Sequence, residues 1–135
     1  MDVVVGIIFR GNKFLIEKRK KDESRDPGIV CLPGGHVETG EAKEETLIRE
    51  MKEELGIIVK KLKFIKKDFW TASDGKKQNI YYYIILEYNG KPVCKTAKEI
   101  KWLSNTEEID IKADRDIVEE LRAKMPPTGF EPAAF

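Results

Sequence analysis

The chain lacks the features that place a protein in a membrane, in a disulfide framework or on a nucleic acid. Its 135 residues contain no apolar run near the roughly 20 residues that a membrane-spanning helix needs. Its two cysteines, Cys31 and Cys94, have neither a CxxC spacing nor a histidine-rich partner motif, so we expect free buried thiols. With 25 Lys and Arg against 24 Asp and Glu, the net charge of +1 indicates neither a nucleic-acid nor a membrane partner.

The N-terminal stretch MDVVVGIIFRGNK lacks a basic region and a small-residue cleavage site. We therefore expect it to form a first strand rather than a signal peptide, and we expect a cytoplasmic protein. The length, with 36% charged and 41% hydrophobic residues, predicts one globular domain over residues 1–124. The proline-containing segment 125–135 is expected to be a disordered extension.

The pattern of apolar residues predicts an α/β domain with a mixed sheet and two helices packed on it. One helix is predicted to begin near Thr39 or Gly40 and to end at Gly56, and a second to run from near Asp114 to the prolines after residue 125. Apolar and alternating runs predict strands over 3–9, 13–20, 57–70, 79–88 and 99–103, the first two joined by a turn at Gly11. A short apolar piece at 29–33 ends at Pro33.

The first predicted helix and the loop before it are strongly acidic. Residues 34–57 hold seven glutamates against three basic residues. Since an α-helix advances about 100° per residue, Glu50, Glu53 and Glu54 share one face, where like charges repel one another. A solvated acidic face is one interpretation, but few lysines stand at compensating positions. Three converging carboxylates are instead typical of a site for Mg²⁺ or Mn²⁺.

The opposite side of this helix carries Ile48, Met51 and Leu55, which we expect to pack against the sheet. Core residues and carboxylates would then be separated on the two sides of one helix.

The spacing of residues around this helix is specific. Gly35 is followed after five residues by Glu41 and, after seven more, by the run REMKEELGI at 49–57. This arrangement resembles the signature of the Nudix hydrolases, with Met51 and Ile57 at its apolar positions. The resemblance implies an α/β/α sandwich with a mixed β-sheet and a loop-helix-loop metal site. It also implies hydrolysis of a diphosphate linked to another moiety, with Mg²⁺ or Mn²⁺ as cofactor.

The same resemblance implies roles for individual residues of the motif. Glu50, Glu53 and Glu54 match metal ligands, as does the carbonyl group of Gly35, and Glu50 is also our first choice for the general base. Arg49 matches a residue that pairs with Glu41 and holds the loop against the helix. We therefore predict Glu50, Glu53 and Arg49 as the catalytic group and the Arg49–Glu41 pair as its support.

Residues outside the motif have competing interpretations. Glu99 is a further candidate ligand or base, with a structural role at a strand edge as the alternative. Arg19 resembles a phosphate-contacting position, but it is equally typical of an exposed strand-end cation. His36 is predicted to be a loop residue near phosphate. Asp116 is a candidate for binding a purine edge, whereas Asp114 better fits a helix N-cap.

The substrate is predicted from the short length and single-domain organisation of the chain more than from individual residues. A short single domain resembles the MutT-like enzymes, which cleave nucleoside triphosphates to monophosphate and pyrophosphate. ADP-ribose and dinucleoside polyphosphates are alternative substrates, and a nucleotide-binding domain without turnover is an alternative of a different class. The intact set Glu50, Glu53 and Glu54 argues against such a binder. We expect a nucleotide as the partner and a monomer or homodimer as the assembly.

Overall fold

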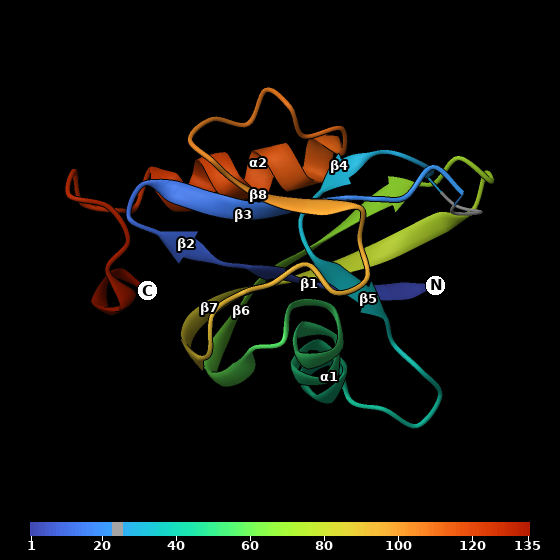
Figure 1. Cartoon of the computed structure of the whole chain (residues 1–135), viewed down its shortest axis with the longest axis horizontal. Coiled ribbons are helices and arrows are strands. Elements are labelled where there is room, and N and C mark those ends of the chain that lie inside the picture. Colours follow the sequence, from blue (N-terminus) through green and yellow to red (C-terminus); the bar gives the residue numbers. More distant parts are fainter. Residues whose placement is uncertain (23–25) are drawn as a thin grey trace.

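Two four-stranded sheets form the centre of the computed structural model, which describes residues 1–22 and 26–135 (Figure 1). In the first sheet β1 runs parallel to β7 and antiparallel to β5, while β6 pairs antiparallel with β7. This sheet is therefore mixed, as the sequence predicted. Its strands, in spatial order, are β5 (Gly34–His36), β1 (Asp2–Ile7), β7 (Lys77–Asn89) and β6 (Ile58–Thr71).

The second sheet is antiparallel and is built around one strand that pairs with three others. The turn of its hairpin contains Gly11, whose φ of 61° favours a residue without a Cβ atom. The predicted strand over 3–9 is divided, because β1 belongs to the first sheet and β2 to the second. The central strand is β3 (Lys13–Lys18), and its partners are β2 (Phe9–Arg10), β4 (Val30–Cys31) and β8 (Glu99–Leu103).

Two α-helices lie on opposite sides of the sheets (Figure 1). α1 (Lys43–Leu55) begins slightly after its predicted start and ends at Gly56, which has a φ of 69° and donates its N–H to the Lys52 carbonyl oxygen. α2 (Lys112–Arg122) begins two residues before Asp114. Within the described ranges, neither helix is long and apolar enough to cross a membrane.

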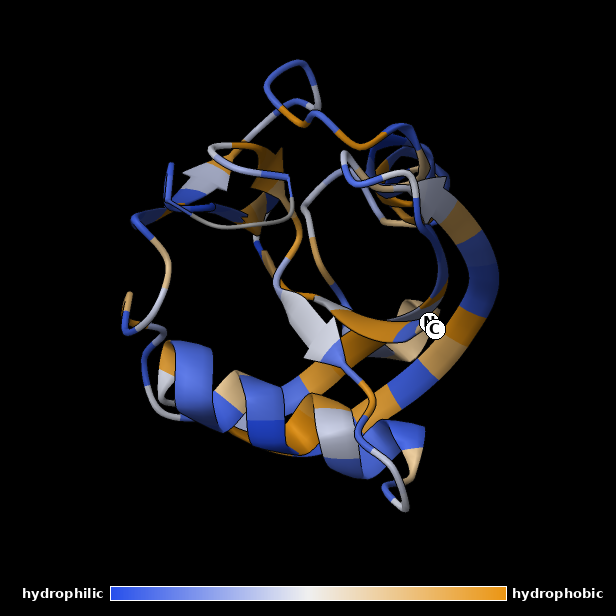
Figure 2. Cartoon of the chain, turned by 90° about the vertical axis from the view of Figure 1, so that its right-hand side faces the viewer, coloured by the Kyte–Doolittle hydropathy of each residue, from blue (hydrophilic) through white to orange (hydrophobic). Residues whose placement is uncertain are grey.

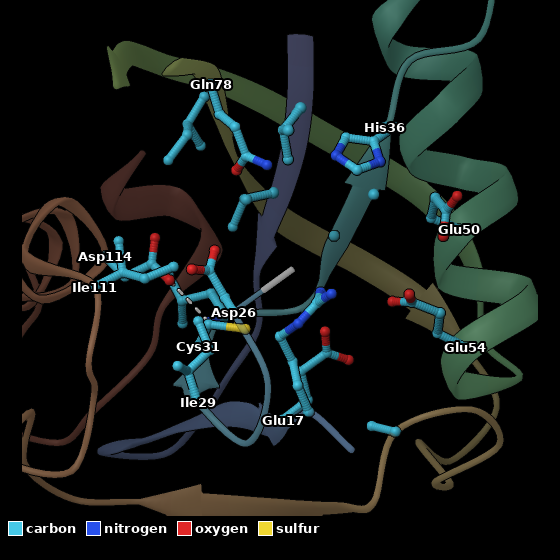
Figure 3. Close-up of a pocket in the computed structure, with 18 of the residues that line it drawn as sticks. Glu17, Asp26, Ile29, Cys31, His36, Glu50, Glu54, Gln78, Ile111 and Asp114 are labelled. Atoms are coloured by element: carbon cyan, nitrogen blue, oxygen red, sulfur yellow. Dashed lines mark hydrogen bonds between the residues drawn. The ribbon is translucent and has the colours of Figure 1, made fainter. Parts of the chain in front are cut away.

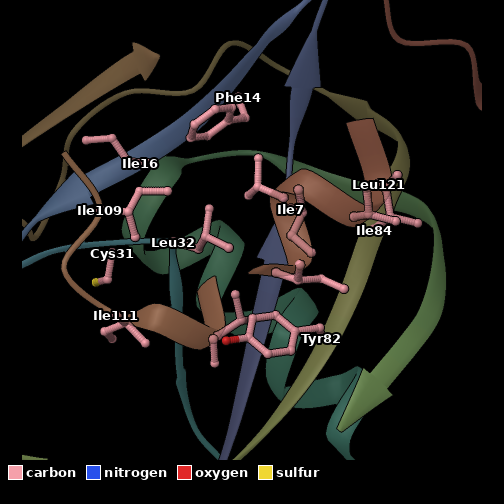
Figure 4. Close-up of a cluster of buried hydrophobic side chains, with 14 of the residues drawn as sticks. Ile7, Phe14, Ile16, Cys31, Leu32, Tyr82, Ile84, Ile109, Ile111 and Leu121 are labelled. Atoms are coloured by element: carbon pink, nitrogen blue, oxygen red, sulfur yellow. The ribbon is translucent and has the colours of Figure 1, made fainter. Parts of the chain in front are cut away.

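Alternating residues of the central strands build two separate cores, one toward each helix. On β7, Tyr82 and Ile84 belong to the cluster that includes Leu121 of α2 (Figure 4), whereas Tyr83 and Ile85 belong to the cluster beneath α1. Figure 2 shows hydrophobic strands behind a largely hydrophilic outer side of α1. The arrangement of helix, sheets and helix is the predicted α/β/α sandwich.

The buried stripe of α1 is displaced from its predicted position. Leu47, Met51 and Leu55 are at most 1% exposed, whereas Ile48 is 41% exposed. The stripe thus follows a spacing of four residues, and the prediction that Ile48 packs on the sheet was wrong. Cys94 is also exposed, while Cys31 is buried as expected.

The C-terminal segment 125–135, expected to be a disordered extension, packs on the β2–β3 hairpin in the structure. The Phe130 ring stacks on Phe9 with 5.8 Å between ring centroids, and its N–H donates to the Gly11 carbonyl oxygen at 2.9 Å. Phe135 stacks on Phe130 in turn at 6.1 Å. Aromatic side chains supply apolar surface that the proline pattern did not predict.

Candidate active site

A cavity of about 700 Å³ gathers most of the residues that the sequence singled out. It extends from the glutamates of α1 to the segment that leads into α2 (Figure 3). Glu50 and Glu54 lie at one end, Asp26 and Asp114 lie at the other, and Glu17 lies between them. The predicted residues that line it are Arg19, Gly35, His36, Glu50, Glu53 and Glu54.

Arg49 and Glu41 form a two-pronged ion pair between α1 and the preceding loop. The Arg49 Nε and Nη2 atoms donate to the two Glu41 oxygens at 2.8 and 3.0 Å, and Thr46 Oγ1 donates to Glu41 Oε1 at 2.6 Å. The Arg49 hydrogen bonds, followed by that from Thr46, lower the pKa of Glu41 to about 2. The pair therefore ties the loop to the helix as the Nudix resemblance implies.

The remaining donor of Arg49 faces the acidic side of α1. Nη1 donates to Glu50 Oε1 at 3.0 Å and to Glu53 Oε2 at 3.1 Å. One guanidinium thus donates hydrogen bonds to three carboxylates, including that of Glu41, and its Nη2 also lies 3.7 Å from Oε1 of Glu38. This contact partly neutralises the like charges for which the sequence had suggested a metal ion.

Glu54 is in a different environment from the other two glutamates of this face. Its Oε2 atom is buried and has no hydrogen-bond partner among the residues that the structure describes. Burial, followed by the charges of Glu17 and Glu50, raises the pKa of Glu54 to about 10. Burial also raises the pKa of Glu50, against the lowering effect of Arg49. A cluster of poorly solvated carboxylates therefore occupies this end of the cavity.

Glu17 is the member of this cluster that sequence reasoning missed. It lies on β3 within the stretch LIEKR and is only 6% exposed, whereas the sequence-based candidate in this stretch is Arg19. A signal was present, since Glu17 follows the buried run Phe14–Ile16 in a strand flanked by neighbours on both sides. A buried carboxylate in such a strand lowers stability unless it is hydrogen-bonded, paired with a cation or bound to a metal, so an acidic residue there is a candidate for a site.

Gly34 and Gly35, at the start of the motif, lie too close to neighbouring atoms for a side chain to fit at either position. A Cβ atom on Gly35 would lie 2.2 Å from Cδ of Glu50, and one on Gly34 would lie 2.1 Å from the carbonyl oxygen of Val4. Gly34 therefore allows the pairing of β5 with β1, and Gly35 makes room for the Glu50 side chain.

The donors at this end of the cavity fit a hard divalent cation. They are carboxylate oxygens, one of which, Oε2 of Glu54, is buried without a partner. As they stand, no three Asp, Glu, His or Cys side chains within residues 1–22 and 26–135 are grouped so that they would hold a metal ion. Glu50 and Glu53 instead each accept a hydrogen bond from Arg49 at one of their two carboxylate oxygens.

Besides the pair Arg49 and Glu41, which lies beside the cavity, two predicted residues lie outside it. Glu99 is at the start of β8, where its Oε1 is 3.9 Å from Nζ of Lys101. Asp116 is on α2 and accepts a hydrogen bond from Nζ of Lys112 at 2.7 Å, which lowers its pKa. It borders a separate recess beside β6. The structure therefore does not bring Glu99 or Asp116 to the glutamates of α1.

Asp114 lines the cavity and is not the helix N-cap that we expected, because Ile111 holds that position. Its carboxylate is buried and accepts hydrogen bonds from the N–H of Leu32 at 3.0 Å and from the Tyr82 hydroxyl at 2.5 Å. Burial raises its pKa to about 6, although both hydrogen bonds act in the opposite direction. Asp114 therefore connects α2 to β7 and to the segment between β4 and β5 at the cavity wall.

Comparisons with known proteins agree with this geometry. An ADP-ribose pyrophosphatase of Methanocaldococcus jannaschii is 51% identical to the chain over 57 residues, which cover 42% of the chain but only 32% of that protein. An 8-oxo-dGTP diphosphatase of Buchnera aphidicola subsp. Schizaphis graminum is 32% identical over 105 residues, covering 76% of the chain and 75% of the relative.

A solved structure shows the same fold. The MutT protein from Methanosarcina mazei Go1 superposes with a TM-score of 0.78 at 22% identity, covering 91% of the chain and 93% of that structure. The family model described as the NUDIX domain matches residues 1–124. The chain therefore belongs to the NUDIX domain family, and it is a Nudix hydrolase.

Proposed function

We propose that the chain is a metal-dependent pyrophosphohydrolase that cleaves a nucleoside triphosphate to a monophosphate and pyrophosphate. The observation that carries this proposal is the buried Oε2 of Glu54, which lacks a partner among carboxylates at one end of a cavity of about 700 Å³. A cavity of this size accommodates a small ligand such as a nucleotide. The relative named 8-oxo-dGTP diphosphatase supports the choice of a triphosphate.

Glu50, Glu53, Glu54 and the Gly35 carbonyl group would hold Mg²⁺ or Mn²⁺ at this end of the cavity. When bound, the cation neutralises phosphate charge and lowers the pKa of a coordinated water. The backbone of Gly35 lies beside the Glu50 side chain, and a Cβ atom at this position would collide with that side chain. The buried Oε2 of Glu54 offers a metal ligand that accepts no hydrogen bond from residues 1–22 or 26–135.

The other residues act on the substrate or on the position of the ligands. Glu50 accepts a proton from the attacking water, whose oxygen forms a bond to phosphorus as the P–O anhydride bond breaks. Arg19 and His36 line the cavity, where their nitrogens donate to phosphate oxygens. Arg49 and Glu41 hold α1 against the loop that carries Gly35. Glu99 and Asp116 have no part in this scheme.

A nucleoside diphosphate derivative is the second candidate substrate. The match to the ADP-ribose pyrophosphatase of M. jannaschii has the higher identity, but it spans about a third of that protein. These 57 residues do not by themselves define a substrate site. The match therefore supports ADP-ribose less strongly than the longer match to the 8-oxo-dGTP diphosphatase supports a triphosphate. Dinucleoside polyphosphates and nucleotide binding without turnover are the remaining alternatives.

A panel of nucleotides incubated with Mg²⁺, with products identified by mass spectrometry, tests this proposal. We expect nucleoside triphosphates to give the monophosphate and pyrophosphate. Formation of AMP and ribose 5-phosphate from ADP-ribose, at a higher kcat/KM, would transfer the assignment to the second candidate. Binding of every nucleotide without any product would show that the domain is a binder.

A further inference from the structure

One side of the first sheet carries aromatic rings that the mechanism above does not use. Where β6 pairs with β7, Phe64 lies opposite Tyr83 and Lys67 lies opposite Tyr81. Residues opposite one another point to the same side of a sheet, and both tyrosines pack in or on the cluster beneath α1. Phe69, which follows Lys67 by two positions, points to that side as well. Phe64, Tyr81 and Phe69 therefore share the α1 side of the sheet.

These rings form a row that α1 leaves uncovered. Phe64 and Phe69 are 47% and 57% exposed. At about 3.3 Å per residue along β6, they lie roughly 16 Å apart. Tyr81 lies between them on the neighbouring strand, with 6.5 Å between its ring centroid and that of Phe64. The row is thus aromatic, exposed and extended along the sheet.

Lysine ammonium groups lie over two of these rings. Nζ of Lys43, the first residue of α1, is 4.4 Å from the centroid of the Tyr81 ring, and Nζ of Lys67 is 5.6 Å from it. Nζ of Lys77 is 4.5 Å from the centroid of the Phe69 ring. Within residues 1–22 and 26–135, none of these three lysines forms an ion pair. Their charges therefore lie beside flat rings without a carboxylate to neutralise them.

The net charge of +1, from which we expected no nucleic-acid partner, is unevenly distributed. Residues 58–77, which comprise β6, the following turn and the start of β7, hold seven lysines against two aspartates. Asp68 points to the other side of β6, where its Oδ2 is 4.0 Å from Nζ of Lys66, and Asp74 lies in the turn. The α1 side of this segment is therefore basic although the chain as a whole is nearly neutral.

We propose that this surface binds single-stranded nucleic acid, with bases stacked on Phe64, Tyr81 and Phe69. Every base has a flat face that stacks on an aromatic ring, so such binding tolerates many sequences. As a base takes its place on a ring, the ammonium group over that ring contacts the adjoining phosphate instead. The lysines that supply these contacts are Lys43, Lys67 and Lys77.

The chemistry of the surface favours a single strand over other anionic partners. A duplex keeps its base faces stacked on one another, so it has none to offer to the rings. An anionic membrane would attract the lysines but has no flat group to stack on Tyr81. The surface is also separate from the catalytic cavity, because Gln78 and Ile80, which line the cavity, alternate along β7 with the residues of the α1 side.

Fluorescence anisotropy with a dye-labelled oligothymidylate of about 12 nucleotides tests the proposal. A 5′-hydroxyl end leaves no terminal phosphate for the cavity, and EDTA prevents turnover. We expect the logarithm of the association constant to fall against the logarithm of the salt concentration with a slope of about −2, since each lysine contact with a single strand contributes about 0.7. The duplex and inorganic polyphosphate should bind more weakly. Absence of binding at low salt, or equal affinity for the single strand and polyphosphate, would overturn the proposal.

Adjacent lysines on opposite sides of β6 provide a matched pair of variants. Lys67→Gln should weaken oligothymidylate binding and reduce the salt slope by about 0.7. Lys66→Gln removes the same charge from the other side, where Nζ of Lys66 is 2.8 Å from Oε1 of Glu120, and it should leave both quantities unchanged. Equal effects of the two substitutions would show attraction to overall charge alone and would overturn the proposal.

Phe69→Leu separates stacking from charge, because leucine keeps an apolar side chain but has no ring. The affinity for oligothymidylate should fall at least about fivefold, while the affinity for polyphosphate stays the same. Hydrolysis should also stay the same, since Phe69 does not line the catalytic cavity. An unchanged affinity for oligothymidylate would refute the stacking. If this variant fails to fold in thermal melting, the comparison of Lys67→Gln with Lys66→Gln decides.

Sedimentation with vesicles of phosphatidylcholine and phosphatidylserine identifies a membrane surface as the alternative. Binding to these vesicles but not to oligothymidylate would overturn the proposal. Oligonucleotide binding needs neither metal nor turnover. A failure of the proposed hydrolysis would therefore leave this inference intact, and a failure of oligonucleotide binding would leave the proposed hydrolysis intact.

Discussion

Glu54→Gln should make the metal-free protein more stable, although it changes a residue of the candidate metal site. The pKa of Glu54 is about 10 in the folded chain, against an ordinary value of 4.5. Between these values the folded state binds one proton more than the unfolded state, so the free energy of unfolding falls as pH rises. Since pH 7 is about 2.5 units above the ordinary pKa of 4.5, the free energy of unfolding at pH 7 is lower by about 3 kcal/mol than at pH 4.5.

Glutamine has nearly the same shape and no charge to bury, so the substitution removes this loss. In EDTA we expect the variant to exceed the wild type by up to about 3 kcal/mol at pH 7, and the two to converge near pH 4.5. Urea unfolding at pH 5, 6, 7 and 8 measures the difference. Stability should rise on substitution and catalysis should fall, because a ligand is lost.

Glu53→Gln is the matched control for this experiment. The Glu53 side chain is 57% exposed and contacts Arg49 at 3.1 Å, so its substitution should change stability by less than about 1 kcal/mol. The sequence alone suggested that removing this charge would relieve repulsion, but the contact with Arg49 offsets that gain. A Glu54→Gln variant that is less stable at pH 7, or that keeps the wild-type pH slope, would refute the argument.

Three further predictions concern activity. Hydrolysis should vanish in EDTA and return with Mg²⁺ or Mn²⁺, while Ca²⁺ should support binding with poor turnover; full activity in EDTA would exclude the proposed mechanism. Arg49→Ala should lower both metal affinity and kcat/KM more than Arg49→Lys does, because it releases Glu41, Glu50 and Glu53 together; unchanged values in both assays would contradict its supporting role. Gly35→Ala should lower kcat at least about tenfold with the fold retained, since its Cβ atom would displace the Glu50 side chain; circular dichroism and steady-state kinetics on one sample check both parts.

The sequence could predict which residues around α1 lie close together, because these residues are neighbours along the chain. Gly35, Glu41 and the glutamates of α1 lie within twenty residues, where helical geometry and fixed spacing determine which side chains meet. The end of α1 at Gly56 was equally clear, because a left-handed residue there strongly favours glycine.

The rest of the cavity depends on contacts between distant segments. Glu17 meets Glu54 only because β3 and α1 pack against the same cavity, and Asp26 meets Ser73 across 47 residues of chain. No periodicity relates such residues. The continuous apolar run that leads up to Glu17 in β3 could have drawn notice to this carboxylate, but nothing in the sequence singled out Asp26.

In the metal-free protein, the guanidinium of Arg49 supplies positive charge beside the glutamates that would otherwise face the metal ion. Two of its nitrogens are committed to Glu41, and the third lies between Glu50 and Glu53. The acidic side of α1 is therefore held together before any cation arrives, and folding need not wait for the ion. A metal ion that binds there competes with the Arg49 guanidinium for Glu50 and Glu53. The affinity for the ion therefore reflects the difference between the attraction of these carboxylates to the ion and their attraction to Arg49. The Arg49–Glu41 pair still attaches the helix to the loop when the ion binds.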